Sequence, residues 1–157
     1  MGDAPAKPRL NIRFLYHYCT DIAAMRAFYT DGIGMIETGH IEQEGFGWVC
    51  YDSEGLQLMF FRWDTPLPVA EGFAAQPGDG GGESSRSSFS IEVPEADFPA
   101  VYERLKAAGT TAMTDAPTWR QKSYWGWTVN DPMGATIELY YSPAAKPEGD
   151  EPIWAPS

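Results

Sequence analysis

A chain of 157 residues with 43% hydrophobic and 14% aromatic residues has room for one ordinary domain, and this composition excludes a disordered class. Its net charge of −11 repels nucleic acid and anionic lipid surfaces, so neither is expected as a partner, whereas a cationic small molecule is attracted. Two cysteines imply no disulfide framework, and no apolar run approaches the roughly 20 residues of a membrane helix, so we expect a cytoplasmic protein.

The first half of the chain predicts one helix among four strands. Residues 1–10 are rich in Pro and Ala and are interpreted as an N-terminal arm. The aromatic run at 13–19 predicts a strand, and Thr20 or Asp21 offers an N-cap for a helix that glycines end at about Gly34. Three further strands are expected at Met35–Glu42, Phe46–Asp52 and Leu56–Trp63.

A linker separates this half from a second half with the same pattern. Residues 64–87 combine prolines, a Gly-rich stretch and a Ser cluster, so we predict a flexible connection, with mobility and proteolysis at Pro77–Ser87. An alternating strand at 88–93 follows, and then a helix over Pro94–Ala108. The remaining strands are expected at Ala112–Thr114, Lys122–Asn130 and Ala135–Ser142.

The two halves form an internal β-α-β-β-β repeat, and each half alone would leave one sheet face open. We therefore predict an α+β fold with two tandem βαβββ modules, which form a curved mixed sheet around a central cavity with the helices on its outer face. This single domain covers 11–143, and a C-terminal tail follows. Its parts are module one (11–63), the linker (64–87) and module two (88–143), and the tail covers 144–157.

Three segments resemble one known family. The helix and turn at Asp21–Met35, the start of the second half at Ser88–Gly109 and the closing hairpin at Asp131–Leu139 resemble the vicinal oxygen chelate superfamily. This superfamily includes glyoxalases, bleomycin-resistance proteins and extradiol dioxygenase-like enzymes. The order and spacing of the segments carry the resemblance, which covers nearly the whole chain apart from the arm, the linker and the tail.

The resemblance also implies where the metal of the family's enzymes would lie. Its ligand positions fall at Phe14, Gln57, Ser88 and Glu138 of this chain. Phe14 has no ligand atom and a neutral Ser88 is a poor ligand, whereas a transition-metal site normally needs three or more protein ligands. We therefore expect no metal ligand and no cofactor, with a divalent metal as the alternative.

The two histidines do not restore such a site. His17 has the opposite strand parity to Phe14, so its side chain is expected to face the helix, unless a β-bulge turns it into the cavity. His40 lies in or near a strand of module one and is interpreted as packed or solvated.

The parity of Phe14 predicts which side chains line the cavity. They are largely aromatic, with a few hydroxyl groups and carboxylates, which is typical of a small-molecule site. The predicted ligand-binding residues are Phe14, Tyr16, Trp48, Gln57, Met59, Phe61, Ser88, Ser90, Glu92, Tyr124, Thr128, Glu138 and Tyr140. Because a carboxylate among aromatic side chains is costly without a partner, Glu138 is expected to meet a hydrogen-bond donor or a cationic ligand.

The favoured function is binding without chemistry. The resemblance to bleomycin-resistance members implies a homodimer that sequesters a planar aromatic or cationic natural product, as in antibiotic resistance. Two enzyme alternatives stay open. One is a metal-dependent lyase, isomerase, dioxygenase or thiol transferase, and the other is a cofactor-free enzyme in which Glu138 is the base and Tyr124 the acid.

Overall fold

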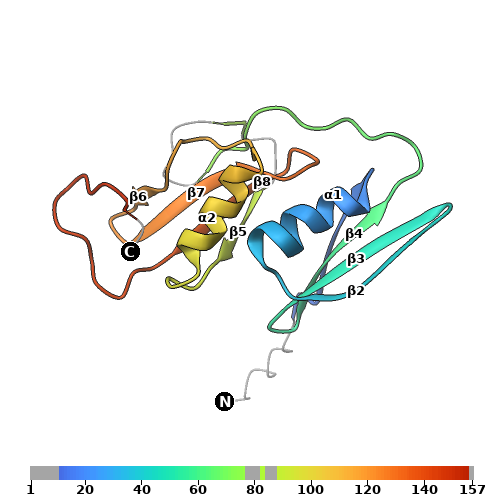
Figure 1. Cartoon of the computed structure of the whole chain (residues 1–157), viewed down its shortest axis with the longest axis horizontal. Coiled ribbons are helices and arrows are strands. Elements are labelled where there is room, and N and C mark those ends of the chain that lie inside the picture. The colour runs from blue at the N-terminus through green and yellow to red at the C-terminus, as the bar shows by residue number, and fades with distance from the viewer. Residues whose placement is uncertain (1–10, 77–81, 84–87, 156–157) are drawn as a thin grey trace, which may run out of the picture.

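The computed structural model describes residues 11–76, 82–83 and 88–155, which form two modules side by side (Figure 1). Each module has a helix on one face of a four-stranded sheet. Module one contains β1 (Phe14–Cys19), α1 (Ile22–Arg26), the π-helix η1 (Ala27–Ile33), β2 (Glu37–Gln43), β3 (Phe46–Ser53) and β4 (Leu56–Arg62). Module two contains β5 (Ser88–Glu92), α2 (Phe98–Ala107), β6 (Thr118–Arg120), β7 (Tyr124–Asn130) and β8 (Thr136–Tyr141).

The two sheets have the same topology. Their strand orders are β1-β4-β3-β2 and β5-β8-β7-β6, and in each the first strand pairs in parallel with the last strand of its module. The other pairs are antiparallel. This confirms the α+β fold of two βαβββ modules, in which the mixed sheet is divided into two four-stranded sheets.

Strand alternation places the core between the sheets and the helices. Val49 and Phe60 in module one, and Trp127 and Leu139 in module two, are buried with the apolar side of the helices. The residues that alternate with these along each strand point to the opposite face, which we call the open face of each sheet. The structure thereby confirms, for both modules, the strand parity that was predicted from the sequence.

The first helix begins as predicted, and its second part is wider than an α-helix. Asp21 is the N-cap and accepts a hydrogen bond from the Ala24 N–H at 2.9 Å. From Ala27 the helix continues as a π-helix, and Gly34 ends it with a φ of 90°, a conformation that glycine adopts without strain.

Two expected boundaries in module two are wrong. Ala112–Thr114 does not form a strand, since Ala112 makes only an isolated bridge to Val129, and the edge strand is β6 at Thr118–Arg120. The second helix begins at Phe98 rather than Pro94, after a turn in which the Asp97 and Phe98 N–H groups donate to the Pro94 carbonyl.

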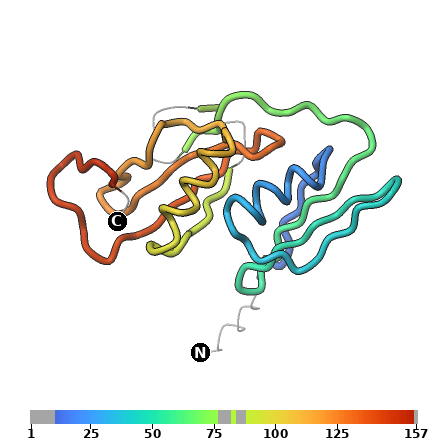
Figure 2. The backbone as a smooth tube through the Cα atoms, in the orientation of Figure 1, coloured from blue at the N-terminus to red at the C-terminus, as the bar shows by residue number. Residues whose placement is uncertain are grey.

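Part of the linker belongs to the fold of module two. Ala74 and Gln76 are buried, and the Ala74 N–H donates to Thr136 Oγ1 at 2.8 Å. The Ala70 N–H donates to the Met133 carbonyl at 3.0 Å, in the turn between β7 and β8. The first part of the linker therefore packs against this turn instead of forming a free spacer, as the tube in Figure 2 shows for the segment that joins the modules. The expected mobile stretch lies almost wholly outside the described residues, as does the N-terminal arm.

Contacts between the helices fix the modules against one another. The Arg104 Nε of α2 donates to the Gly32 carbonyl at 2.9 Å, and Leu105 packs so closely that a Cβ on Gly32 would lie 2.6 Å from its Cδ2. Tyr29 donates its hydroxyl hydrogen bond to Asp131 at 3.0 Å, between η1 and the β7–β8 turn. Burial raises the pKa of both groups, so Tyr29 stays a protonated donor.

The expected C-terminal tail also contributes to the core. Trp154 packs against Phe98 and Tyr102 of α2, and its indole N–H donates to the Tyr141 hydroxyl at 3.2 Å. Among the described residues, no helix is long and apolar enough to span a membrane.

Candidate functional site

The open face of module one is aromatic. Phe14, Tyr16 and Tyr18 alternate along β1 and are 56%, 63% and 51% exposed, which is far more than core aromatic residues show. Their pairing partners on β4 are Gln57, Met59 and Phe61, in that order. Phe61 in turn pairs with Trp48 of β3. The predicted module-one ligand residues therefore share one surface.

His17 lies on the other face, as its parity predicted. Its ring stacks on Phe60 of the core at 6.0 Å and on Phe89 of β5 at 6.1 Å. The register between β1 and β4 runs from Phe14 to Cys19 without a shift, so no β-bulge turns His17 to the open face. The Nδ1 of His40 lies 2.6 Å from Glu37 Oε1, and His40 is paired with the core residue Val49, so it is not part of the open face.

The open face of module two is polar and is centred on Glu138 of β8. This carboxylate is 7% exposed, and both of its oxygens accept hydrogen bonds. Oε1 accepts from Arg120 at 2.8 Å and from the Tyr124 hydroxyl at 3.0 Å, and Oε2 accepts from the Ser90 hydroxyl at 2.6 Å. The donor that the sequence required for Glu138 is therefore provided by the protein itself.

Arg120 is the residue of this site that sequence reasoning missed. It lies on β6, is 8% exposed, and also donates to Thr128 at 2.9 Å and to Thr118 at 3.0 Å. Gly126 leaves the space for the ion pair, because a Cβ there would lie 2.8 Å from Arg120 Cδ and 3.1 Å from Glu138 Oε1. A glycine in the middle of a strand was the available signal that another group approaches closely at this point.

We call Arg120, Glu138, Tyr124, Ser90 and Thr128 the ion-pair cluster. Partial burial, together with the negative charge of Glu138, raises the pKa of the Tyr124 phenol. Tyr124 is thus a protonated hydrogen-bond donor at neutral pH, and its ring contacts Tyr140 with the centroids 5.4 Å apart. The cluster holds one positive and one negative charge in contact.

The structure brings some predicted site residues together and separates others. Ser90, Tyr124, Thr128 and Glu138 belong to the ion-pair cluster, and Tyr140 borders it. The aromatic residues expected around Glu138, such as Phe14 and Tyr16, lie on the other sheet. The two open faces are therefore chemically different, with aromatic walls in module one and fixed polar groups in module two.

A divalent metal does not fit the four family positions. Phe14 and Gln57 pair with each other on the first sheet, and Ser88 lies on the second sheet, where its hydroxyl accepts from Gln76 at 2.9 Å. Glu138, the strongest of the four donors, is neutralised by Arg120. Among the described residues, no group of three or more His, Cys, Asp or Glu side chains is arranged to hold a metal ion.

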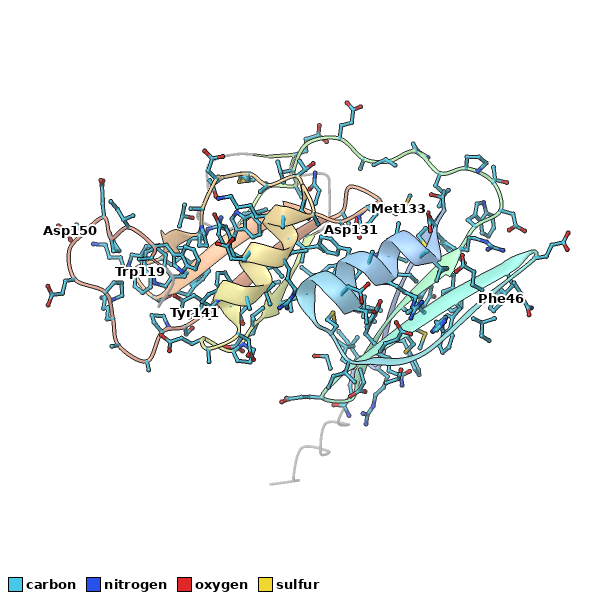
Figure 3. All side chains as sticks on the ribbon, viewed as in Figure 1. Phe46, Trp119, Asp131, Met133, Tyr141 and Asp150 are labelled. Atoms are coloured by element: carbon cyan, nitrogen blue, oxygen red, sulfur yellow. The ribbon has the colours of Figure 1, made fainter. Side chains whose placement is uncertain are left out.

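A cavity lies at the junction of the modules, beside Ser90 of the ion-pair cluster. Its volume is about 470 Å³, and it lies between β4 and β5, with Leu58, Phe89 and Ile91 in its apolar wall. Ser90 and Glu92, two predicted ligand residues, line it as well. A second groove, of about 430 Å³, lies on module one beside Tyr18, Phe61 and Trp63. Figure 3 shows Phe46, which also lines this groove, at the outer end of module one.

The match to a protein-family model identifies the class. Residues 13–139 match the model of the Glyoxalase/Bleomycin resistance protein/Dioxygenase superfamily. The chain therefore belongs to this superfamily, as the sequence resemblance implied. No curated protein matches the chain significantly.

Solved structures show the same fold at low identity. A glyoxylase/bleomycin resistance protein/dioxygenase domain from Frankia sp. EAN1pec is 15% identical, with a TM-score of 0.62 over 87% of this chain and 100% of that one. A glyoxalase/bleomycin resistance protein/dioxygenase from Nocardioides is 18% identical, with a TM-score of 0.55 and 92% of each chain covered. The fosfomycin resistance protein FosX from Mesorhizobium loti is 11% identical, with a TM-score of 0.57 over 86% of this chain and 92% of that one. These likenesses concern the fold.

Proposed function

We propose that this protein binds a planar aromatic or cationic small molecule without a metal ion and without chemistry. The observation that carries the proposal is the Arg120–Glu138 ion pair. The guanidinium supplies a positive charge to the carboxylate at the position where the superfamily's enzymes hold a metal ligand. Donors of the protein then occupy three of the roughly four lone-pair positions of Glu138, and Arg120 compensates its charge, which makes it a poor ligand for a catalytic metal.

The aromatic open face supports a planar ligand. Three rings of β1 that are more than half exposed form an apolar surface of a kind that soluble proteins rarely leave uncovered. Aromatic faces bind planar groups by stacking and bind cations through their quadrupole. The net charge of −11 adds a long-range attraction for a cation. Sequestration of a drug-like natural product is the proposed role.

The same geometry argues against Glu138 as a general base. Its two oxygens already accept from Arg120, Tyr124 and Ser90, which leaves about one of four lone-pair positions for a substrate proton. Tyr124 keeps its proton and donates it in a hydrogen bond to the Glu138 carboxylate, so its role is to hold Glu138 and not to act as an acid. The cofactor-free enzyme is therefore the less favoured candidate.

Binding and metal content test the proposal together. Acridine, titrated at a pH where it is neutral, is expected to quench tryptophan fluorescence saturably, with the same affinity before and after treatment with EDTA. Replacing Tyr16→Ala should weaken the binding of acridine by about 0.5–1.5 kcal/mol, the range for one aromatic pair. Elemental analysis should give far less than one transition-metal ion per chain.

Two results would overturn the proposal. One is a stoichiometric metal ion whose removal abolishes binding, and the other is metal-dependent turnover of a small substrate. As a matched control, Val69→Ala alters a side chain that is 57% exposed but lies in the linker, outside the open faces. It should leave acridine affinity unchanged.

We also propose that the chain forms a homodimer in which the partner lies over the aromatic open face and encloses the ligand there. Replacing Phe14→Asp puts a charge on that face, whereas Val69→Asp puts one at an equally exposed position in the linker, 57% against 56%. Light scattering is expected to give twice the chain mass for the wild type and for Val69→Asp, and a lower mass for Phe14→Asp. A wild-type monomer at high concentration would contradict this proposal.

A further inference from the structure

The groove on module one combines several aromatic rings with a carboxylate. Tyr18, Phe46, Phe61 and Trp63 line it, together with Arg62 and Asp64, and we call these four rings the aromatic groove. Its volume of about 430 Å³ is large enough for a small organic cation. Tyr18 follows Tyr16 on the open face, and Trp63 follows Phe61 at the end of β4, so the groove continues the aromatic surface at its edge.

The rings of the groove do not fill it by stacking on one another. Tyr18 and Trp63 have centroids 5.1 Å apart and planes inclined by 70°, and Tyr18 and Phe61 have centroids 6.4 Å apart and planes inclined by 51°. Inclined rings leave π-surface uncovered and turn it in different directions. Tyr18 and Trp63 are accordingly 51% and 49% exposed. Such walls can surround a rounded group better than a flat one.

The rim of the groove carries one carboxylate and one guanidinium. The Asp64 side chain is 67% exposed, and its contact with Arg62 Nε is long, at 3.8 Å. Arg62 also lines the groove, and its Nη2 donates to the Gln43 carbonyl at 2.6 Å. Asp64 is therefore the more exposed charge of this loosely held pair, and the net charge of the chain has the same sign as its carboxylate.

We infer that the aromatic groove binds a quaternary or methylated ammonium group. A rounded, weakly hydrated cation gains from several π-faces at once, and this is how aromatic side chains recognise quaternary ammonium ligands. The inference rests on the proposed metal-free binding role, because it assigns the cationic part of the ligand to one place. The planar part would then lie along β1, on Tyr16 and Phe14.

Choline and 3,3-dimethylbutan-1-ol form the matched pair of probes, since they have nearly the same shape and differ in charge. Isothermal titration of the full chain is expected to show saturable binding of choline, and binding of the neutral alcohol weaker by about fivefold or more. Trp63→Leu and Tyr18→Leu should each lower the affinity for choline by about fivefold. Asp64→Asn should lower the affinity for choline by about twofold and leave the affinity for the alcohol unchanged.

Trp119→Leu is the control for loss of a tryptophan. Trp119 lies in module two, at the opposite end of the molecule from Phe46 (Figure 3), and its replacement should leave choline affinity unchanged. Equal affinity for the two probes, or choline binding that survives Trp63→Leu, would overturn the inference. If acridine binds and choline does not, the inference that the aromatic groove binds an ammonium group is wrong, and the proposed function stands. If neither binds, the proposed function fails as well.

Discussion

Replacing Arg120→Met is expected to lower the free energy of unfolding by about 3–5 kcal/mol, the usual effect of leaving a buried charge without its partner. Arg120 and Glu138 are both more than nine-tenths buried, and their contact is 2.8 Å. Methionine keeps the volume of the stem and removes the guanidinium. Glu138 would then face the protein interior with only the neutral donors Tyr124 and Ser90.

Urea unfolding followed by tryptophan fluorescence measures this loss. Arg62→Met is the control, because its ion pair with Asp64 is long and partly exposed and should contribute less than about 1 kcal/mol. The double variant Arg120→Met/Glu138→Gln should recover a large part of the loss, since it removes the unpaired charge as well. If Arg120→Met costs no more than Arg62→Met, the ion pair is not the centre of this site.

Replacing Gly134→Ala should destabilise the protein by about 2–4 kcal/mol, from left-handed backbone strain together with overpacking. Gly134 has a φ of 76°, and a Cβ at this position would overlap the carbonyl oxygen of Ala70. The overlapping atoms belong to the backbone of the linker, so no side-chain rotation relieves the contact. The linker would have to move off the β7–β8 turn, with loss of the hydrogen bond from Ala70 to Met133.

Gly109→Ala separates the two causes. Gly109 has a similar φ of 72°, but a Cβ there would meet no atom within 4 Å. It should therefore cost only the strain, about 1–2 kcal/mol. Urea or thermal unfolding of both variants gives the comparison. Equal losses would mean that the first part of the linker does not pack against this turn in solution.

Strand parity could be predicted from the sequence because side chains alternate with a period of two. The alternation of β1 and β5 assigned Phe14 and Ser90 to one face and His17 and Phe89 to the other, as the structure shows. The caps at Asp21 and Gly34 were also visible, since capping depends on local hydrogen bonds and on the left-handed conformation. These are properties of neighbouring residues, and a single chain is enough to recognise them.

Short and irregular elements could not be predicted in the same way. The edge strand β6 has three residues, which is too few to show alternation, and it was expected six residues earlier at Ala112. The buried part of the linker has the composition of a loop. Ala74 is nevertheless fully buried, because Thr136 accepts its N–H and the β7–β8 turn packs against the segment before it.

The sequence by itself determined the repeat, the face to which most side chains point, and that Glu138 lies on the open face of its sheet and needs a partner. Only the tertiary structure decided what that partner is. Arg120 lies 18 residues before Glu138, and two antiparallel pairings, β6 with β7 and β7 with β8, bring the two together over Gly126. The contact depends on the register of three strands and on space left by a glycine, which local patterns do not contain. For the same physical reason, the difference between the aromatic and the polar open face became visible only once the strands of each sheet were paired.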